Sequence, residues 1–172
     1  MSVTHSTAPQ AATDSTAPAR AQIDPRGQRF AAWLTTAVFA VVLLAAPAPW
    51  ALALLGAQLV VFATGAFAGP ARTPYAWLFR TFVRPRLGAP RELEDAAPPR
   101  FAQSVGLAFA VVSLLGYAAG LELLGAIAAG MALGAAFLNA AFGFCLGCEM
   151  YLLGKRAGFR AALTVVTDSA TL

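Results

Sequence analysis

Both cysteines of the chain lie three residues apart, at Cys145 and Cys148, within the segment GFCLGCEMYLLGKR. A C-x-x-C spacing lets two thiols join without large backbone movement, and the attacking sulfur in such chemistry must be a thiolate. We therefore expect a redox-active pair in which Cys145, the N-terminal member, is the nucleophile and Cys148 is the resolving thiol. The adjacent Glu149 is a candidate proton acceptor, although a carboxylate that only faces the membrane interface would occupy the same place.

Three other interpretations of the cysteine pair stay open on the sequence alone. Cysteine is a small apolar residue, so both could simply pack in a helix rich in alanine and glycine. Two thiolates are half of a tetrahedral metal site, and the only histidine, His5, stands far away in a polar segment. The thiols could also relay a small solute or a sulfur species across the membrane. We expect no metal and no cofactor.

The composition places this pair in a membrane protein. Of the 172 residues, 59% are hydrophobic and 12% are charged, and the mean hydropathy is +0.67. Soluble domains carry about 25% charged residues, and a chain of this length could not hide so much apolar surface in a water-soluble core. An integral membrane protein is therefore expected.

The apolar residues form four uncharged blocks, each long enough for a helix to cross about 30 Å of hydrocarbon. Every backbone amide inside lipid must be satisfied within its own segment, so we expect helices. They predict an all-α integral membrane four-helix bundle of two hairpins, with spans at residues 30–46, 50–69, 101–121 and 123–144. This membrane domain would cover residues 23–156, between a disordered tail at 1–22 and a C-terminal tail at 157–172.

The segment between the hairpins, residues 70–100, is rich in proline and charge and is expected to stay outside the bilayer. Within it, residues 74–84 are too few to span, yet they show a helical periodicity of apolar residues. We expect a short amphipathic helix in the membrane interface, with one face turned toward the acyl chains. That face would consist of Tyr75, Leu78, Phe79 and Phe82. The alternative is a plain extension of the second span.

Positive charge is confined to three segments of the chain. All 12 lysines and arginines lie before the first span, in the segment 70–100 or after the fourth span. By the positive-inside rule these segments face the cytoplasm, and so do both termini. The arginines flank membrane segments and form no separate basic domain. The expected partner is therefore the lipid bilayer, and no nucleic acid is expected.

The fourth span begins near Glu122 and reaches the cytoplasmic boundary about 20 residues later, close to the cysteines. A permanent structural disulfide is disfavoured in that reducing compartment. Gly143 allows the helix to break there. If a new helix begins near Cys145, its N-terminal dipole would favour the thiolate, as would the nearby Lys155 and Arg156.

A faint internal repeat relates the two hairpins. The segment RFAAWLTTAVFAVVLL from Arg29 and the segment RFAQSVGLAFAVVSLL from Arg100 agree at seven of sixteen positions. Both start with Arg-Phe where a helix enters the membrane. Duplication of a helical hairpin would produce this pattern, and chance agreement among alanine, valine and leucine is the alternative. Small residues four apart, as in GFCLG, indicate closely packed helices.

Three segments carry a family resemblance: IDPRGQRF near the start, RPRLGAPRELEDAAPPRFAQ between the hairpins, and FLNAAFGFCLGCEMYLL at the end of the fourth span and beyond it. Together they resemble a bacterial family of small membrane proteins described as domain of unknown function 4395, over residues 23 to about 155. The resemblance implies a multi-pass protein of the bacterial cell membrane. It also implies association with a cytoplasmic thioredoxin-like or sulfurtransferase protein.

Two functional hypotheses follow. The first is thiol-redox or sulfur handling at the cytoplasmic membrane face through the C-x-G-C pair, with the segment 70–100 as a docking surface. The alternative is a non-catalytic membrane scaffold or a small-solute permeation protein. Whether the chain is an enzyme, in this case a thiol-disulfide oxidoreductase, stays open at this level.

Overall fold

The computed structural model describes residues 21–90 and 92–169, with side chains described through residue 158. Most of the predicted disordered tail, residues 1–20, lies outside the described residues. Of the predicted C-terminal tail, the part up to Ser169 continues the last helix, and residues 170–172 lie outside the described range.

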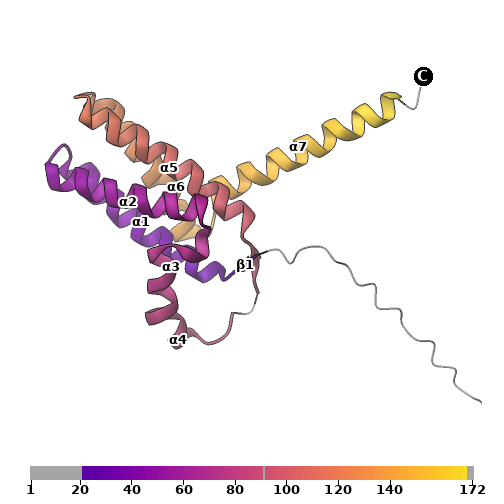
Figure 1. The fold of residues 1–172 in the computed structure, drawn as a ribbon, viewed down its shortest axis with the longest axis horizontal. Coiled ribbons are helices and arrows are strands. Elements are labelled where there is room, and N and C mark those ends of the chain that lie inside the picture. Colours follow the sequence, from indigo (N-terminus) through magenta and orange to yellow (C-terminus); the bar gives the residue numbers. More distant parts are fainter. Residues whose placement is uncertain (1–20, 91, 170–172) are drawn as a thin grey trace, which may run out of the picture.

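Four long apolar helices within the described residues form the membrane bundle (Figure 1). They are α1 (Pro25–Ala45), α2 (Pro49–Phe67), α5 (Ala97–Ala118) and α6 (Glu122–Phe142). The predicted fold class, an integral membrane four-helix bundle of two hairpins, is confirmed. Helices α1 and α5 begin before the apolar blocks because each starts with polar or proline-rich turns, and Pro25 stands at the first helical position of α1, where proline is tolerated.

The helices of the first hairpin pack mainly against helices of the second hairpin, and less against each other. Helix α1 packs mainly against α6, and α2 packs mainly against α5. Arg29 of α1 donates to the carbonyl oxygens of Ala140 and Ala141 at 3.3 Å, in the last turn of α6. Arg100 of α5 donates in the same way to the last turn of α2, at 2.7 Å. The two Arg-Phe segments of the repeat therefore play equivalent structural roles.

Small residues set the close contacts of this bundle. A Cβ at Gly106 of α5 would lie 2.8 Å from the ring of Phe62 on α2. A Cβ at Gly116 would lie 2.7 Å from the backbone nitrogen of Gly125, where α5 turns into α6. The buried hydroxyl of Ser113 donates to the carbonyl oxygen of Gly125 at 2.9 Å and ties the same two helices together. The expected close packing through small residues is thus present at these positions.

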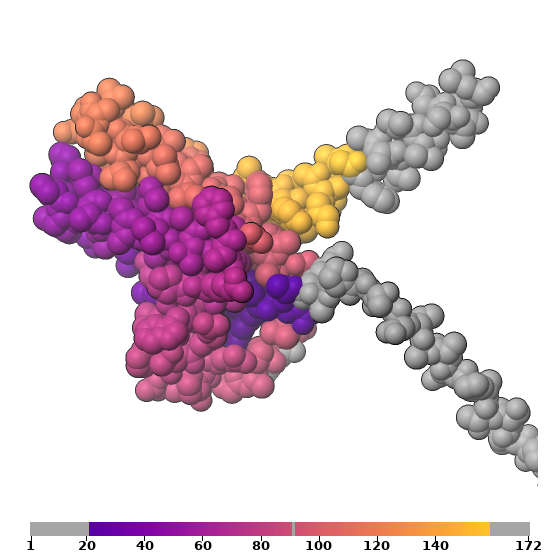
Figure 2. All heavy atoms as spheres, viewed as in Figure 1, coloured from indigo at the N-terminus to yellow at the C-terminus, as the bar shows by residue number. Residues whose placement is uncertain are grey.

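The arginine caps lie at one end of the bundle, where α1 and α5 begin and α2 and α6 end, and the segment that joins the two hairpins lies at the same end. We call this the polar end. In Figure 1 the segment after α2 leaves the bundle here, and α7 departs from the same end in another direction. Figure 2 shows both as separate projections from the bundle.

The segment after α2 is helical, as predicted, but its apolar side chains do not all face the lipid. A short turn η1 (Pro70–Arg72) leads into α3 (Pro74–Leu78), a π-helical turn η2 (Phe79–Val83) and α4 (Arg84–Leu87). The expected short amphipathic helix is present. However, Phe79 is 3% exposed and packs on Phe30 and Gly27 of α1. The prediction that Phe79 turns toward acyl chains is wrong, because that side chain is needed to dock the segment onto α1.

The opposite side of this segment stays exposed. Trp77 and Phe82 are each about half exposed, and their rings meet edge to face with centroids 6.1 Å apart. Arg80, Arg84 and Arg86 are exposed beside them. An aromatic pair flanked by cations suits the headgroup region of a bilayer, where tryptophan and arginine side chains place apolar and charged parts at different depths.

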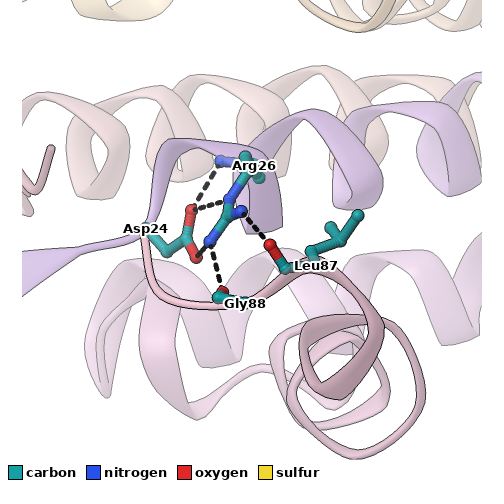
Figure 3. Close-up of polar contacts among 4 residues, drawn as sticks. All are labelled: Asp24, Arg26, Leu87 and Gly88. Atoms are coloured by element: carbon teal, nitrogen blue, oxygen red, sulfur yellow. Dashed lines mark hydrogen bonds and ion pairs between the residues drawn. The ribbon is translucent and has the colours of Figure 1, made fainter. Parts of the chain in front are cut away.

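The start of α1 is clamped to the end of α4 (Figure 3). Asp24 caps α1 by accepting from the amide of Arg26 at 3.0 Å, and the two side chains form an ion pair. The Arg26 guanidinium also donates to the carbonyl oxygens of Leu87 and Gly88, each at 3.2 Å. The hydrogen bond from the Arg26 side chain lowers the pKa of the Asp24 carboxyl group from its usual value. The clamp therefore joins two segments that lie about 60 residues apart.

A small antiparallel ribbon closes the same end. Strand β1 (Gln22–Ile23) pairs with β2 (Glu94–Asp95), and the amide of Ala96 donates to the carbonyl oxygen of Ala21 at 2.8 Å. This ribbon is not predictable from the sequence, because two-residue strands carry too little hydrophobic alternation to be recognised.

Candidate functional site: the C-x-G-C turn and the cavity beside it

The turn between α6 and α7 (Leu146–Ser169) positions the cysteines. Helix α6 ends at Phe142, and Gly143 follows with φ +71°, a left-handed conformation that glycine adopts without steric cost. Its amide donates to the carbonyl oxygen of Asn139 at 3.0 Å, and the amide of Phe144 donates to that of Leu138. This is a glycine C-cap. The predicted break at Gly143 is therefore where the chain turns from α6 into α7.

Cys145 stands at the N-terminus of α7 and caps it. Its Sγ accepts a hydrogen bond from the amide of Cys148 at 3.3 Å, and its carbonyl oxygen accepts from the amide of Glu149 at 3.0 Å. The two cysteines form a disulfide, with Cα atoms 5.2 Å apart. The unpaired amides and the dipole at a helix N-terminus stabilise negative charge, so the Cys145 sulfur occupies the place where a thiolate is favoured.

Gly147, between the cysteines, lets α7 approach α5 closely. A Cβ at this position would lie 2.6 Å from the Cβ of Ala102 and 2.7 Å from its Cα. Next along the two helices, the rings of Phe101 and Tyr151 are in contact, with centroids 5.9 Å apart. These contacts fix the first turns of α7 on the start of α5, and so they fix where the cysteine pair lies relative to the bundle.

The charged residues near the pair contribute less than the sequence suggested. Lys155 follows Cys148 by seven residues, which is about 10 Å along a helix, and its ammonium lies over the ring of Tyr151. The helix terminus, rather than a lysine in contact, is therefore the local source of positive potential. Glu149 is exposed in the first turn of α7.

A cavity of about 600 Å³ opens beside Cys145 at the polar end and extends between the spans. Its lining comes from α1, α2, α3, α5, α6 and the first turn of α7, and it includes Cys145 while Cys148 is not part of it. The two sulfurs therefore have different surroundings. Asn139, in the last turn of α6, lines this cavity too.

A chain of hydrogen-bonded polar groups lies beside the cavity, and its two outer members, Thr35 and Tyr75, belong to the lining. Gln58, 1% exposed in the middle of α2, donates to the hydroxyl of Thr35 on α1 at 3.4 Å. Its carbonyl oxygen accepts from the hydroxyl of Tyr75 on α3 at 2.7 Å. Burial raises the pKa of Tyr75, which keeps this phenol a neutral donor. Tyr75 was also predicted to turn toward acyl chains, and this prediction is wrong as well. Its hydroxyl instead points into the bundle, where it donates to Gln58.

Gln103 on α5 also lines the cavity. The carbonyl oxygen of Gln103 on α5 is buried and receives no hydrogen bond from any residue that the structure describes. Its side chain packs across Gly65 of α2, where a Cβ would lie 2.8 Å from it. Sequence reasoning missed Gln58 and Gln103. Polar residues inside otherwise apolar spans are the signal that could have found them.

A comparison with protein families matches the description "Domain of unknown function (DUF4395)" to residues 23–156. The chain belongs to the DUF4395 family. The matched range starts in β1 and ends in the early part of α7, so this family region contains the clamp at Asp24, the cavity and the cysteine turn. Comparisons with curated proteins and with solved structures found no match. Within the described residues, no three His, Cys, Asp or Glu side chains gather to hold a metal ion.

Proposed function

We propose that this member of the DUF4395 family carries out thiol–disulfide exchange through Cys145 and Cys148, at the cytoplasmic face of the membrane. The observation that carries the proposal is the cap of α7, where the Cys145 sulfur accepts the Cys148 amide at a helix N-terminus. A cysteine that served only for packing would need no such alignment. The placement of the pair within disulfide reach supports the same reading.

The exchange proceeds in two balanced steps. The Cys145 thiolate attacks one sulfur of a disulfide on a thioredoxin-like protein, whose second sulfur leaves as a thiolate and takes up a proton. The Cys148 thiol then loses its proton, with the exposed Glu149 carboxylate as acceptor, and attacks the Cys145 sulfur. The mixed disulfide breaks, the partner leaves fully reduced, and Cys145 and Cys148 become the disulfide. The reverse sequence oxidises a partner dithiol.

The docking surface for this partner would be the polar end. The cysteine turn, the segment from η1 to α4 and the first turns of α7 all border the same end of the bundle. The orientation follows from charge, because the lysines and arginines of the described residues flank this end, and positive segments stay in the cytoplasm. A sulfurtransferase partner would use the same surface and would present a cysteine persulfide instead of a disulfide.

The test uses the two serine variants as each other's control. In membranes with the polar end accessible, Cys148→Ser should trap a mixed disulfide with a thioredoxin-like protein, seen as a reductant-sensitive mass shift. Cys145→Ser should trap none, because it lacks the attacking sulfur. After reduction, Cys145 of the unmodified chain should react with a water-soluble maleimide near neutral pH. If neither thiol reacts until the protein is denatured, exchange is excluded and the pair is a packing feature of a scaffold or permeation protein.

A further inference from the structure

The segment from η1 to α4 carries positive charge that its own sequence does not balance. Four arginines and no aspartate or glutamate occur in residues 70–90. Arg80 and Arg86 are both exposed. Among the described residues, Arg80 makes no hydrogen bond or ion pair, and Arg86 donates only to the carbonyl oxygen of Phe82. A guanidinium group has several N–H donors, so both side chains keep donors for an anion outside the protein.

A π-helical turn places two aromatic rings beside these arginines. In η2 the amide of Arg84 donates to the carbonyl oxygen of Phe79, five residues earlier, instead of to that of the residue four earlier. The wider turn brings side chains that stand five apart onto one face. Trp77 and Phe82 stand five apart, and their exposed rings meet edge to face with centroids 6.1 Å apart. The exposed face therefore combines a flat apolar surface with positive charge.

This exposed face lies at the level of the bilayer surface. The segment starts three residues after α2 ends at Phe67, and its buried Phe79 packs on Gly27 and Phe30 near the start of α1. The apolar block of α1 also begins at Phe30, so the boundary between hydrocarbon and headgroups runs at this level. At such a boundary aromatic rings lie on the hydrocarbon side and guanidinium groups lie among the phosphates.

We propose that this exposed face, which we call the arginine face, binds anionic phospholipids of the leaflet at the polar end. It consists of Trp77, Arg80, Phe82 and Arg86. The arginines contact the phosphate groups, and the rings lie among the upper parts of the acyl chains. The binding is independent of the thiol exchange proposed above, because α7 leaves the polar end in another direction (Figure 1).

Fluorescence of Trp77 tests the proposal. Trp33→Phe and Trp50→Phe leave Trp77 as the only tryptophan. The full chain is placed in nanodiscs of phosphatidylcholine with a minority of phosphatidylglycerol. Bromine, which quenches tryptophan at short range, is carried either by the phosphatidylglycerol or by an equal amount of the phosphatidylcholine. We expect about twofold to fivefold stronger quenching by brominated phosphatidylglycerol, since one arginine near an anionic surface is sufficient for an enrichment of about fivefold.

A chain that keeps Trp50 as its only tryptophan is the control for position. Trp50 is exposed at the start of α2, at the end of the bundle where the hairpin turns contain no lysine or arginine. Both brominated lipids should quench Trp50 equally. A preference at Trp50 as large as that at Trp77 would show that anionic lipid gathers around the whole protein, and the proposal would fail.

Substitutions in the chain that keeps Trp77 separate the arginine face from charge in general. Arg80→Gln with Arg86→Gln should remove the preference for phosphatidylglycerol, whereas Arg80→Lys with Arg86→Lys should keep most of it. Lys155→Gln with Arg156→Gln removes the same charge from the exposed side of α7 and should change little. Melting curves check that each variant folds. If the glutamine pair at the arginine face keeps the full preference, these arginines do not bind the lipid.

Salt gives an answer that needs no arginine variant. In about 1 M salt the Debye length falls to about 3 Å, so the two brominated lipids should then quench Trp77 almost equally. A preference that salt leaves unchanged would contradict attraction between arginine and phosphate. The proposal also fails if neither lipid quenches Trp77, because the segment then stands in water and the arginine face is open to an acidic protein surface instead.

Discussion

At the residue scale, the functional region depends on two glycines that serve different purposes. Gly143 supplies a left-handed backbone conformation, with φ +71°, that ends α6. Gly147 is needed because it has no side chain. It lies so close to Ala102 of α5 that a Cβ would not fit between the two helices. The first glycine turns the chain, and the second lets the new helix lie against the bundle. Together they hold Cys145 at the start of α7 and at the rim of the cavity.

Gly147→Ala should therefore destabilise the protein by about 1–3 kcal/mol, the usual cost of inserting a methyl group into a close contact. The added Cβ would meet the backbone of α5, which cannot move aside as a flexible side chain can. The measurement is the unfolding midpoint of the purified protein in detergent. Gly154→Ala is the matched control on the same helix, since a Cβ there meets nothing within 4 Å. That control should be neutral or stabilising by up to about 1 kcal/mol, because alanine favours helix. Equal effects of both substitutions would contradict the close contact.

At the element scale, each hairpin supplies the cap of a helix in the other. The last carbonyl groups of α2 and α6 have no partners within their own helices, and in lipid such groups are costly. Arg100 and Arg29 satisfy them from α5 and α1. Because the two arginines hold equivalent places in the repeat, this exchange supports duplication of a hairpin as its origin.

Removal of either arginine cap should cost about 1–2 kcal/mol, since each guanidinium makes two hydrogen bonds to helix carbonyl groups and opposes the negative end of the dipole. Arg29→Met and Arg100→Met keep an apolar stem, and Arg72→Met in the exposed turn η1 serves as the control. The two caps lie on different helix pairs, so the double variant should show the sum of the single effects within about 0.5 kcal/mol. Unfolding midpoints of all four variants give the answer. An Arg72→Met effect as large as the others would show that charge, rather than capping, is responsible.

Sequence patterns were sufficient for the elements and insufficient for their contacts. Length and hydropathy predict the four spans, and glycine predicts the break before Cys145, because both depend on local physics. The direction of Phe79 and Tyr75 was predicted wrongly, since an apolar stripe does not reveal whether it meets lipid or another helix. Gln103 lines the cavity, and Gln58 links two other lining residues, Thr35 and Tyr75, only because the helices that carry them pack against one another. The site proper, a capped cysteine beside a partly polar cavity, is a product of packing.

At the scale of the whole molecule, polarity is concentrated at one end. The ribbon, the Asp24–Arg26 clamp, the arginine caps, the docked segment from η1 to α4 and the cysteine turn all surround the polar end (Figure 1). The other end consists of two short turns, and Glu122 follows the second of them. The cavity opens toward the polar end as well. A membrane bundle whose polar groups, cysteine turn and cavity opening all lie at one end is suited to contact molecules from one side of the membrane only.

The polar end should therefore face the cytoplasm. Reporter fusions test this: one after Ala89, between α4 and β2, should be active as a cytoplasmic reporter, and one after Ala119, between α5 and α6, should be active only outside. The lysines and arginines flank the first position and are missing from the turns at the second, so the positive-inside rule gives both outcomes. As a control, Arg72, Arg80, Arg84 and Arg86 changed together to glutamine should weaken the orientation without altering the spans. If the Ala89 fusion reports the exterior, the cysteine pair lies in an oxidising compartment, and the proposed exchange with a cytoplasmic thioredoxin-like protein is wrong.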